Sequence, residues 1–137
     1  MNIKNRQVFQ WPVRIYYEDT DAGGVVYHTN YIKFMERART EWLRDLGFEQ
    51  DELRDNGGVI FAVRSVQVDY ILPAKFNDEL LISSKVIQKG KASISIEQEI
   101  QRDSTRLCKG VIKVATLDDK SFRPKAMPEN LYMAIQL

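Results

Sequence analysis

The sequence has few of the side chains that build metal and redox sites. Its 137 residues include one histidine, His28, and one cysteine, Cys108. A single cysteine excludes an internal disulfide, which is typical of a reducing compartment and predicts a cytoplasmic protein. One histidine and one cysteine provide no cluster of metal ligands. We therefore expect no metal and no cofactor.

Long apolar runs and a charge bias are also absent. No apolar stretch approaches the roughly 18 residues of a membrane-spanning helix, and residues 1–7 lack the apolar core of a signal peptide. With 20 basic and 19 acidic residues the net charge is +1, and no basic run stands out, so nucleic acid is not an expected partner. The Gly-x-Ser-x-Gly, Walker and dinucleotide-binding patterns are missing as well.

The sequence does contain one long helical pattern. The length suits one domain over residues 1–137, and 44% hydrophobic residues can form an ordinary core. Over residues 29–46 apolar residues recur every three or four positions, which predicts an amphipathic helix capped by Thr29 or Asn30 and ended by Gly47. Its apolar face would comprise Tyr31, Phe34, Met35, Ala38, Trp42 and Leu46, while Arg37, Arg39, Glu41 and Arg44 occupy the other faces.

Five segments show the alternation that is typical of half-buried strands. In the first, residues 8–18, Pro12 suggests a sheet edge or a bend, because proline cannot donate a ladder hydrogen bond. In the second, residues 59–70, the apolar positions change parity near Arg64, which predicts a β-bulge. The others follow through short turns over residues 80–87, 93–100 and 108–114. About one helical turn is expected within residues 48–58, and a short terminal helix within 129–135. This order predicts an α+β fold, an antiparallel sheet with the long helix on one face.

The residues that carry chemistry lie between the first strand and the long helix. The first N–H groups of a helix have no intrahelical partner and lie at the positive end of its dipole, so they can hold an oxyanion. Asp21 comes a few residues earlier, on a Gly23-Gly24 turn that permits close approach, and His28 lies at or just before the first turn. This combination suits hydrolysis of an activated acyl group, with the carboxylate attacking the carbonyl or activating a water.

A thioester is the acyl group that such a sparse site handles best. Its leaving thiol has a pKa of roughly 8.5, with cysteine as the guide, and departs without a strong general acid. Structural explanations compete at each position. An Asp-rich turn can simply cap a helix, and a lone histidine is more often a core or surface residue than a catalyst. We expect Cys108 to be a buried, inert thiol.

Residues 11–28 read WPVRIYYEDTDAGGVVYH, and residues 36–41 read ERARTE. These segments resemble the signature of the hotdog-fold acyl-CoA thioesterases of the 4-hydroxybenzoyl-CoA thioesterase group, most closely the subgroup encoded beside the Tol–Pal cell-envelope system. The resemblance implies a five-stranded antiparallel sheet wrapped around one long helix. It implies an acyl-CoA substrate and active sites at the interface of a homodimer, often within a homotetramer. A link to lipid metabolism or to acyl carrier protein is implied by the subgroup alone.

The resemblance also implies roles for individual residues. Asp21 matches the catalytic carboxylate, as nucleophile or general base, and His28 matches a position that this subgroup fills with histidine. A backbone N–H near His28 would polarise the carbonyl, while Asp19 would hold the turn. Candidate substrate contacts are Gly24 and Val25 in the turn, Tyr31, Phe34 and Met35 for the acyl group, and Lys89, Lys91, Arg123 and Lys125 for the coenzyme A phosphates. The predicted acyl contacts could equally be ordinary core residues. The four cationic side chains could equally be solvent-exposed charges on a hairpin turn and a loop.

Two other functions fit the same fold. A noncatalytic acyl-CoA sensor or adaptor would bind the substrate without hydrolysis, but it needs neither Asp21 nor His28. A hotdog dehydratase or hydratase would change the acyl chain instead of releasing a thiol. Those enzymes pair histidine with an acid in other sequence arrangements.

Overall fold

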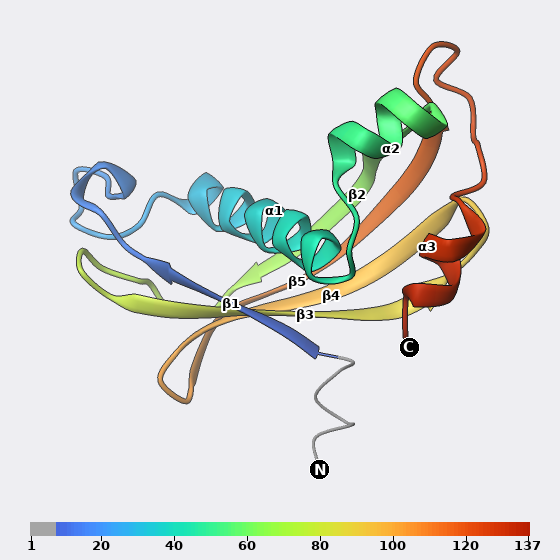
Figure 1. Ribbon diagram of the computed structural model, residues 1–137. Helices are drawn as coiled ribbons and strands as arrows, with labels where there is room; N and C mark the ends of the chain where they lie inside the picture. The colour runs from blue at the N-terminus through green and yellow to red at the C-terminus, as the bar shows by residue number, and fades with distance from the viewer. Residues whose placement is uncertain (1–7) are drawn as a thin grey trace.

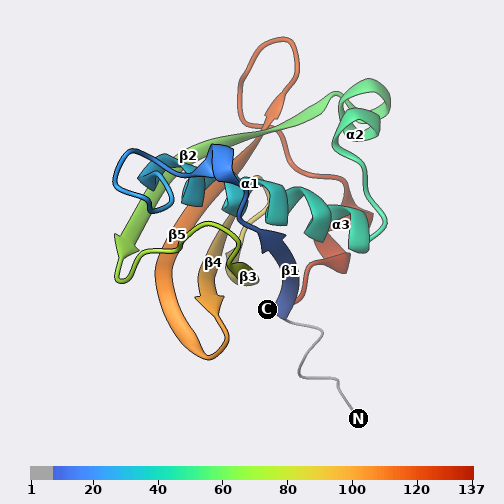
Figure 2. The same ribbon diagram turned by 90° about the vertical axis from the view of Figure 1, so that its left-hand side faces the viewer.

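The computed structural model describes residues 8–137 and shows a five-stranded sheet that curls around one long helix (Figures 1 and 2). All strand pairs are antiparallel, and the order across the sheet is β1-β3-β4-β5-β2. The strands are β1 (Val8–Arg14), β2 (Val59–Tyr70), β3 (Glu79–Lys89), β4 (Ser93–Arg102) and β5 (Thr105–Asp118), and the long helix is α1 (His28–Asp45). The predicted α+β architecture is confirmed.

Strand β1 lies at one edge of the sheet, as Pro12 suggested, but it is shorter than predicted. It pairs with β3 from Val8 to Arg14 and then stops. Residues Tyr17–Asp19 form a 3-10 turn instead of the end of a strand. The Asp19 carboxylate explains the difference, because its Oδ2 accepts a 2.8 Å hydrogen bond from the Tyr16 N–H and so closes the turn locally.

Strand β2 forms the other edge and contains the predicted bulge. Its register against β5 shifts between Val63, which faces Val114, and Ser65, which faces Lys113. The extra residue, Arg64, exchanges the two faces of the strand, as the parity change in the sequence required.

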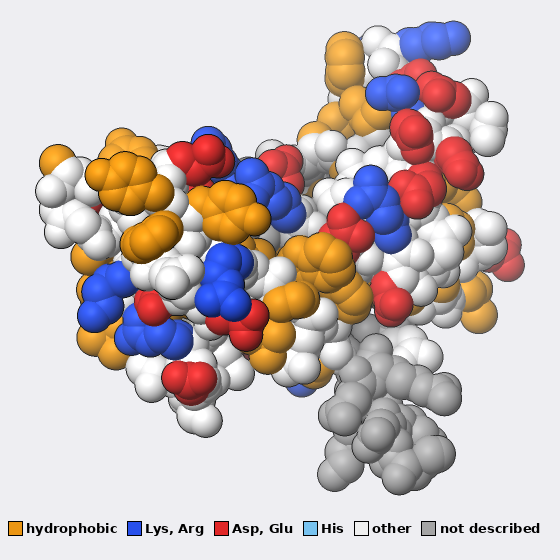
Figure 3. All heavy atoms as spheres, turned by 60° about the vertical axis from the view of Figure 1, so that its left-hand side comes forward, with side chains coloured by type: hydrophobic (Ala, Val, Ile, Leu, Met, Phe, Trp, Pro, Cys, Tyr) orange, Lys and Arg blue, Asp and Glu red, His pale blue; other side chains and the backbone are white. Residues whose placement is uncertain are grey.

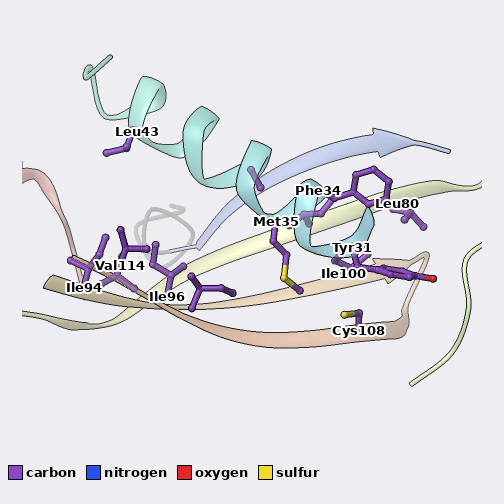
Figure 4. Packing of buried hydrophobic residues seen from close by; sticks show 14 of the residues in the cluster. Tyr31, Phe34, Met35, Leu43, Leu80, Ile94, Ile96, Ile100, Cys108 and Val114 are labelled. Carbon is purple, nitrogen blue, oxygen red and sulfur yellow. The ribbon is translucent and has the colours of Figure 1, made fainter. Parts of the chain in front are cut away.

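The core lies between α1 and the concave face of the sheet, and Figure 4 shows side chains of both meeting there. Residues Tyr31, Phe34, Met35 and Ala38 of α1 are buried, as predicted. Farther along the helix the predicted apolar face was incomplete, because it omitted Leu43. Leu43 is buried, whereas Trp42 and Leu46 are only partly buried against the core. The sheet contributes Leu80, Ile82, Ile94, Ile96, Ile100, Cys108, Ile112 and Val114, among others.

The periodicity also placed Arg39 on an outer face, and that was wrong. Its guanidinium is only partly exposed and donates to Gln98 Oε1 at 3.0 Å. Gln98 is fully buried on the inner face of β4, and its amide nitrogen donates to Met35 O at 3.0 Å and to Ser84 Oγ at 2.8 Å. A polar side chain among the isoleucines of β4 gives the arginine a partner beneath the helix.

The remaining elements differ from the predictions in detail. Helix α2 (Gln50–Gly57) has two turns where one was expected, because Leu53 anchors it in the core and Gly58, at φ +65°, ends it. Helix α3 (Glu129–Ala134) is the predicted terminal helix. Helix α1 begins one residue earlier than predicted, and neither Thr29 nor Asn30 caps it. In the part of the chain that the structure describes, no helix is long and apolar enough to cross a membrane.

Candidate active site

Asp21 is exposed at the start of a tight glycine turn that precedes α1. Its Oδ1 accepts a 2.8 Å hydrogen bond from the Gly23 N–H, and its carbonyl accepts one of 3.0 Å from Gly24. Gly24 has φ +82°, a conformation that side chains other than glycine rarely adopt. The second carboxylate oxygen, Oδ2, has no hydrogen-bond donor among residues 8–137. The turn therefore orients the carboxylate while leaving one oxygen free to react.

Backbone contacts fasten this turn to the rest of the fold. Val25 bridges to Lys75, and the Val26 N–H donates to Ala74 O at 2.9 Å. Asp19 also holds the turn, since its carbonyl accepts from the Tyr27 N–H at 3.0 Å and from Asn30 Nδ2 at 2.9 Å. These bonds agree with the structural role expected for Asp19. They also explain why Asn30 does not cap the helix, because its side chain is already bound to Asp19.

The start of α1 offers open N–H groups beside the turn. Tyr27 occupies the N-cap position and provides no side-chain cap. The Asn30 N–H bonds to Tyr27 O, but those of His28 and Thr29 have no acceptor within the described residues. Two N–H groups at the positive end of the helix dipole can therefore receive a carbonyl oxygen or an oxyanion.

His28, the first residue of α1, lines an open pocket of about 210 Å³ at this end of the molecule. The other lining residues are Val26, Tyr31, Tyr70, Ile71, Leu72 and Pro73. The hydroxyl of Tyr70 donates to His28 O at 2.9 Å, and the ring of Tyr70 lies edge-on to those of His28 and Tyr31, at 6.2 and 5.5 Å. Asp21 and Gly24 do not line this pocket. They lie on the neighbouring turn, and Val25 joins that turn to Val26.

Tyr70 is a site residue that the sequence did not reveal. It ends the second strand predicted from alternation, residues 59–70, and 42 residues separate it from His28. No local pattern links two positions so far apart. Figure 3 shows other apolar side chains exposed at this end of the molecule.

The three predicted acyl contacts fall into two groups. Phe34 and Met35 are buried in the core and do not line the pocket. Tyr31 is buried as well, but it lines the pocket, and its hydroxyl accepts from the Ala74 N–H at 2.9 Å. Cys108 lies buried in the same cluster, and burial raises its pKa to about 12, as expected of an inert thiol.

The four predicted phosphate ligands do not meet the Asp21 turn within the protomer. The β3–β4 turn and the loop after β5 lie at the opposite end of the sheet from the start of α1 (Figure 1). Lys89 already has partners there, because its Nζ donates to the carbonyls of Tyr132 at 2.8 Å and Ile135 at 2.9 Å. Lys125 donates to Gly57 O at 3.0 Å. The Lys91 and Arg123 side chains have no hydrogen-bond or ion-pair partner among residues 8–137.

Two comparisons with known proteins decide the family. Residues 15–135 match the thioesterase-like superfamily. The chain is 44% identical over 126 residues to the acyl-CoA thioesterase YbgC of Haemophilus influenzae, an alignment that covers 92% of this chain and 93% of that protein. This chain belongs to the thioesterase-like superfamily.

Further similarities place the chain within that superfamily. It is 40% identical over 128 residues to the acyl-CoA thioester hydrolase YbgC of Escherichia coli, covering 93% of this chain and 95% of that protein. The crystal structure of a probable thioesterase from Bartonella henselae aligns with a TM-score of 0.84 at 31% identity, covering 88% of this chain and 99% of that one. The hotdog architecture of this chain is thus the architecture of solved thioesterases.

Proposed function

We propose that this protein hydrolyses acyl-CoA thioesters to a free acid and coenzyme A, with Asp21 as nucleophile or general base. One observation carries the proposal. Asp21 is held by the Gly23 N–H at 2.8 Å in a turn that leads directly to the uncapped start of α1. A reactive carboxylate and donors for the carbonyl oxygen thus belong to one short segment. The acyl-CoA activity of the YbgC relatives supports the same reaction.

The reaction can follow either of two balanced routes. In the first, an Asp21 oxygen attacks the thioester carbon, the C–S bond breaks, coenzyme A leaves as a thiolate, and water then hydrolyses the mixed anhydride. In the second, Asp21 takes a proton from a water that attacks the same carbon, and the C–S bond then breaks to release coenzyme A as a thiolate. In both, the open N–H groups of His28 and Thr29 stabilise the developing oxyanion. The His28 side chain assists from the edge of the pocket. Coenzyme A is part of the substrate, and neither route uses a metal or a cofactor.

A second subunit would complete this site. Strand β2 is an edge strand that exposes some of its apolar side chains, with Val63 at 49% and Val66 at 42%. Such an edge favours pairing with another strand. If two β2 strands pair antiparallel about a two-fold axis, the first residues of one strand lie beside Tyr70 at the end of the other.

This pairing would also bring cations to the substrate. The loop after β5 is tied to the start of β2, because the Asp119 N–H donates to Gly58 O at 2.9 Å. Arg123 of the partner subunit and Lys125 of the partner subunit would then approach the pocket and bind the coenzyme A phosphates. A homotetramer, acyl carrier protein as a partner and a role in lipid metabolism remain predictions from the resemblance, and a cytoplasmic location remains a prediction from the single cysteine.

A thiol-release assay over acyl-CoAs of varied length and aromatic character tests the reaction. We expect Asp21→Asn to lower kcat by at least about 100-fold, the usual scale for losing a general base, with an unchanged melting temperature. His28→Ala should lower kcat with a smaller change in substrate affinity. Asp45→Asn, the same change at an exposed site at the end of α1, serves as the control.

The outcomes separate the alternatives. Near-normal turnover by Asp21→Asn would refute the assignment of Asp21, and an unaltered kcat in His28→Ala would remove that side chain from the mechanism. Acyl-CoA binding by the wild type without thiol release at any chain length would indicate a sensor or adaptor. A changed acyl double bond without free thiol would indicate a dehydratase or hydratase.

A further inference from the structure

Tyr70 connects an edge strand of the sheet to the first peptide group of α1. It is the last residue of β2, and its hydroxyl donates a 2.9 Å hydrogen bond to the main-chain oxygen of His28. Burial raises the pKa of Tyr70, so the hydroxyl keeps its proton throughout the neutral range and stays a donor. A few residues later the Ala74 N–H donates to the Tyr31 hydroxyl at 2.9 Å. Residues 70–74 are therefore fastened to the first turn of α1 at two points.

The bond to His28 O acts on a neighbouring donor. The carbonyl of His28 and the N–H of Thr29 belong to the same peptide group, which is planar and trans. Fixing the oxygen therefore fixes the direction of the Thr29 N–H, which points out of the start of the helix. That N–H has no acceptor among the described residues. A hydrogen bond to the carbonyl also polarises the peptide group, which strengthens its N–H as a donor.

We propose that Tyr70 is a positioning residue for the oxyanion site, holding the His28–Thr29 peptide so that the Thr29 N–H meets the thioester oxygen. This inference rests on the proposed function. Tyr70 acts through a main-chain group and needs no contact with the reacting atoms. Because it lies on the edge strand β2, it also links the edge of the sheet to the geometry of the reaction centre.

The test is Tyr70→Phe, which keeps the ring and removes the hydroxyl. We expect kcat to fall about three- to tenfold, the range for one neutral hydrogen bond that acts on the transition state. KM should stay within about twofold, because the bond orients a donor for the transition state and does not bind the ground state. Size-exclusion elution should not change.

Tyr27→Phe is the matched control. The Tyr27 ring lies 4.6 Å from that of His28, yet its hydroxyl has no hydrogen-bond partner in the described part of the chain. Its kcat should remain within about twofold of wild type, since no hydrogen bond is lost. Wild-type kcat in Tyr70→Phe, or an equal loss in Tyr27→Phe, would overturn the proposal.

A His28→Ala background separates the main-chain bond from the ring contact. The substitution removes the imidazole but keeps the carbonyl at position 28, so Tyr70→Phe should lower kcat by the same factor there. If it causes no further loss, Tyr70 acts through the imidazole and the proposal fails.

The Asp21→Asn variant distinguishes failure of the proposed catalytic role from failure of the positioning role. Normal hydrolysis by that variant refutes the proposed role of Asp21, whereas its inactivity with a normal Tyr70→Phe refutes the positioning role alone.

Discussion

The buried amide of Gln98 makes a quantitative prediction about what holds α1 over the sheet. This side chain accepts from Arg39 and donates to Met35 O and Ser84 Oγ, so it joins the middle of the helix to β3 and β4. Gln98→Met keeps an unbranched side chain of similar length and removes all three bonds. The substitution therefore tests polar anchoring with little change in packing volume.

The expected cost follows from what each partner loses. Ser84 is buried, and its hydroxyl would be left without a partner, at a cost of about 1–3 kcal/mol. The Arg39 guanidinium is partly exposed and can turn to water, so losing its acceptor should cost only about 1 kcal/mol. The Met35 carbonyl keeps its hydrogen bond within the helix. The sum is about 2–4 kcal/mol, which corresponds to a fall in melting temperature of roughly 6–14 °C for a chain of this length.

Thermal unfolding at a fixed protein concentration measures this cost, since assembly would make the midpoint concentration-dependent. Gln88→Met on β3, an exposed glutamine with no side-chain hydrogen bond among residues 8–137, is the control and should change the midpoint little. Adding Ser84→Ala to Gln98→Met removes the stranded hydroxyl and should recover about 1 kcal/mol. The reasoning would be refuted if Gln98→Met had the same melting temperature as the Gln88→Met control. It would also be refuted if adding Ser84→Ala to Gln98→Met lowered the melting temperature further.

Two further predictions follow from shifted pKa values. Burial raises the pKa of Cys108 to about 12. A small aromatic disulfide at pH 8 should therefore label no thiol in the folded protein and one thiol per chain after denaturation. Rapid labelling of the folded protein would contradict this prediction. The N–H groups of Ser121 and Lys120 lower the pKa of Asp118 to about 2. The stability it contributes is therefore present above about pH 4 and lost as the pH falls toward 2. Asp118→Asn should flatten the dependence of melting temperature on pH over that interval; an unchanged slope would show that the bonds do not hold the carboxylate.

Sequence periodicity predicted the elements of the fold because their patterns are local. The strands, the long helix and the bulge at Arg64 each follow from spacing within a few residues. Predictions failed where a side chain bonds outside its own element. The Asp19 carboxylate ends β1 by accepting a hydrogen bond from the Tyr16 N–H. The Asp19 carbonyl accepts another from the side chain of Asn30, so Asn30 does not cap α1 as predicted. Arg39 turned inward because Gln98, 59 residues away, offers an acceptor.

The candidate site divides in the same way. The Asp21 turn and the start of α1 are contiguous in sequence, so their proximity could be predicted. The Tyr70 hydroxyl reaches His28 only through the path of β2, which no short pattern encodes. The predicted phosphate contacts had the weakest basis in sequence, since surface lysines and arginines look alike there. Only the structure shows that Lys89 is bound to two carbonyls beside α3.

The catalytic role proposed for an exposed carboxylate poses a physical problem that the arrangement of β2 addresses. Asp21 is open to water, and the pocket beside it is open too. Oriented N–H groups stabilise an oxyanion most strongly where water is excluded. Three pocket-lining side chains lie at the end of the edge strand β2 or directly after it, and each is about half exposed: Tyr70, Ile71 and Leu72. A partner that covers this edge would bury the same three side chains and close the pocket. In the proposed dimer, burial of apolar surface at this edge would therefore favour association. The same burial would exclude water from the reaction centre.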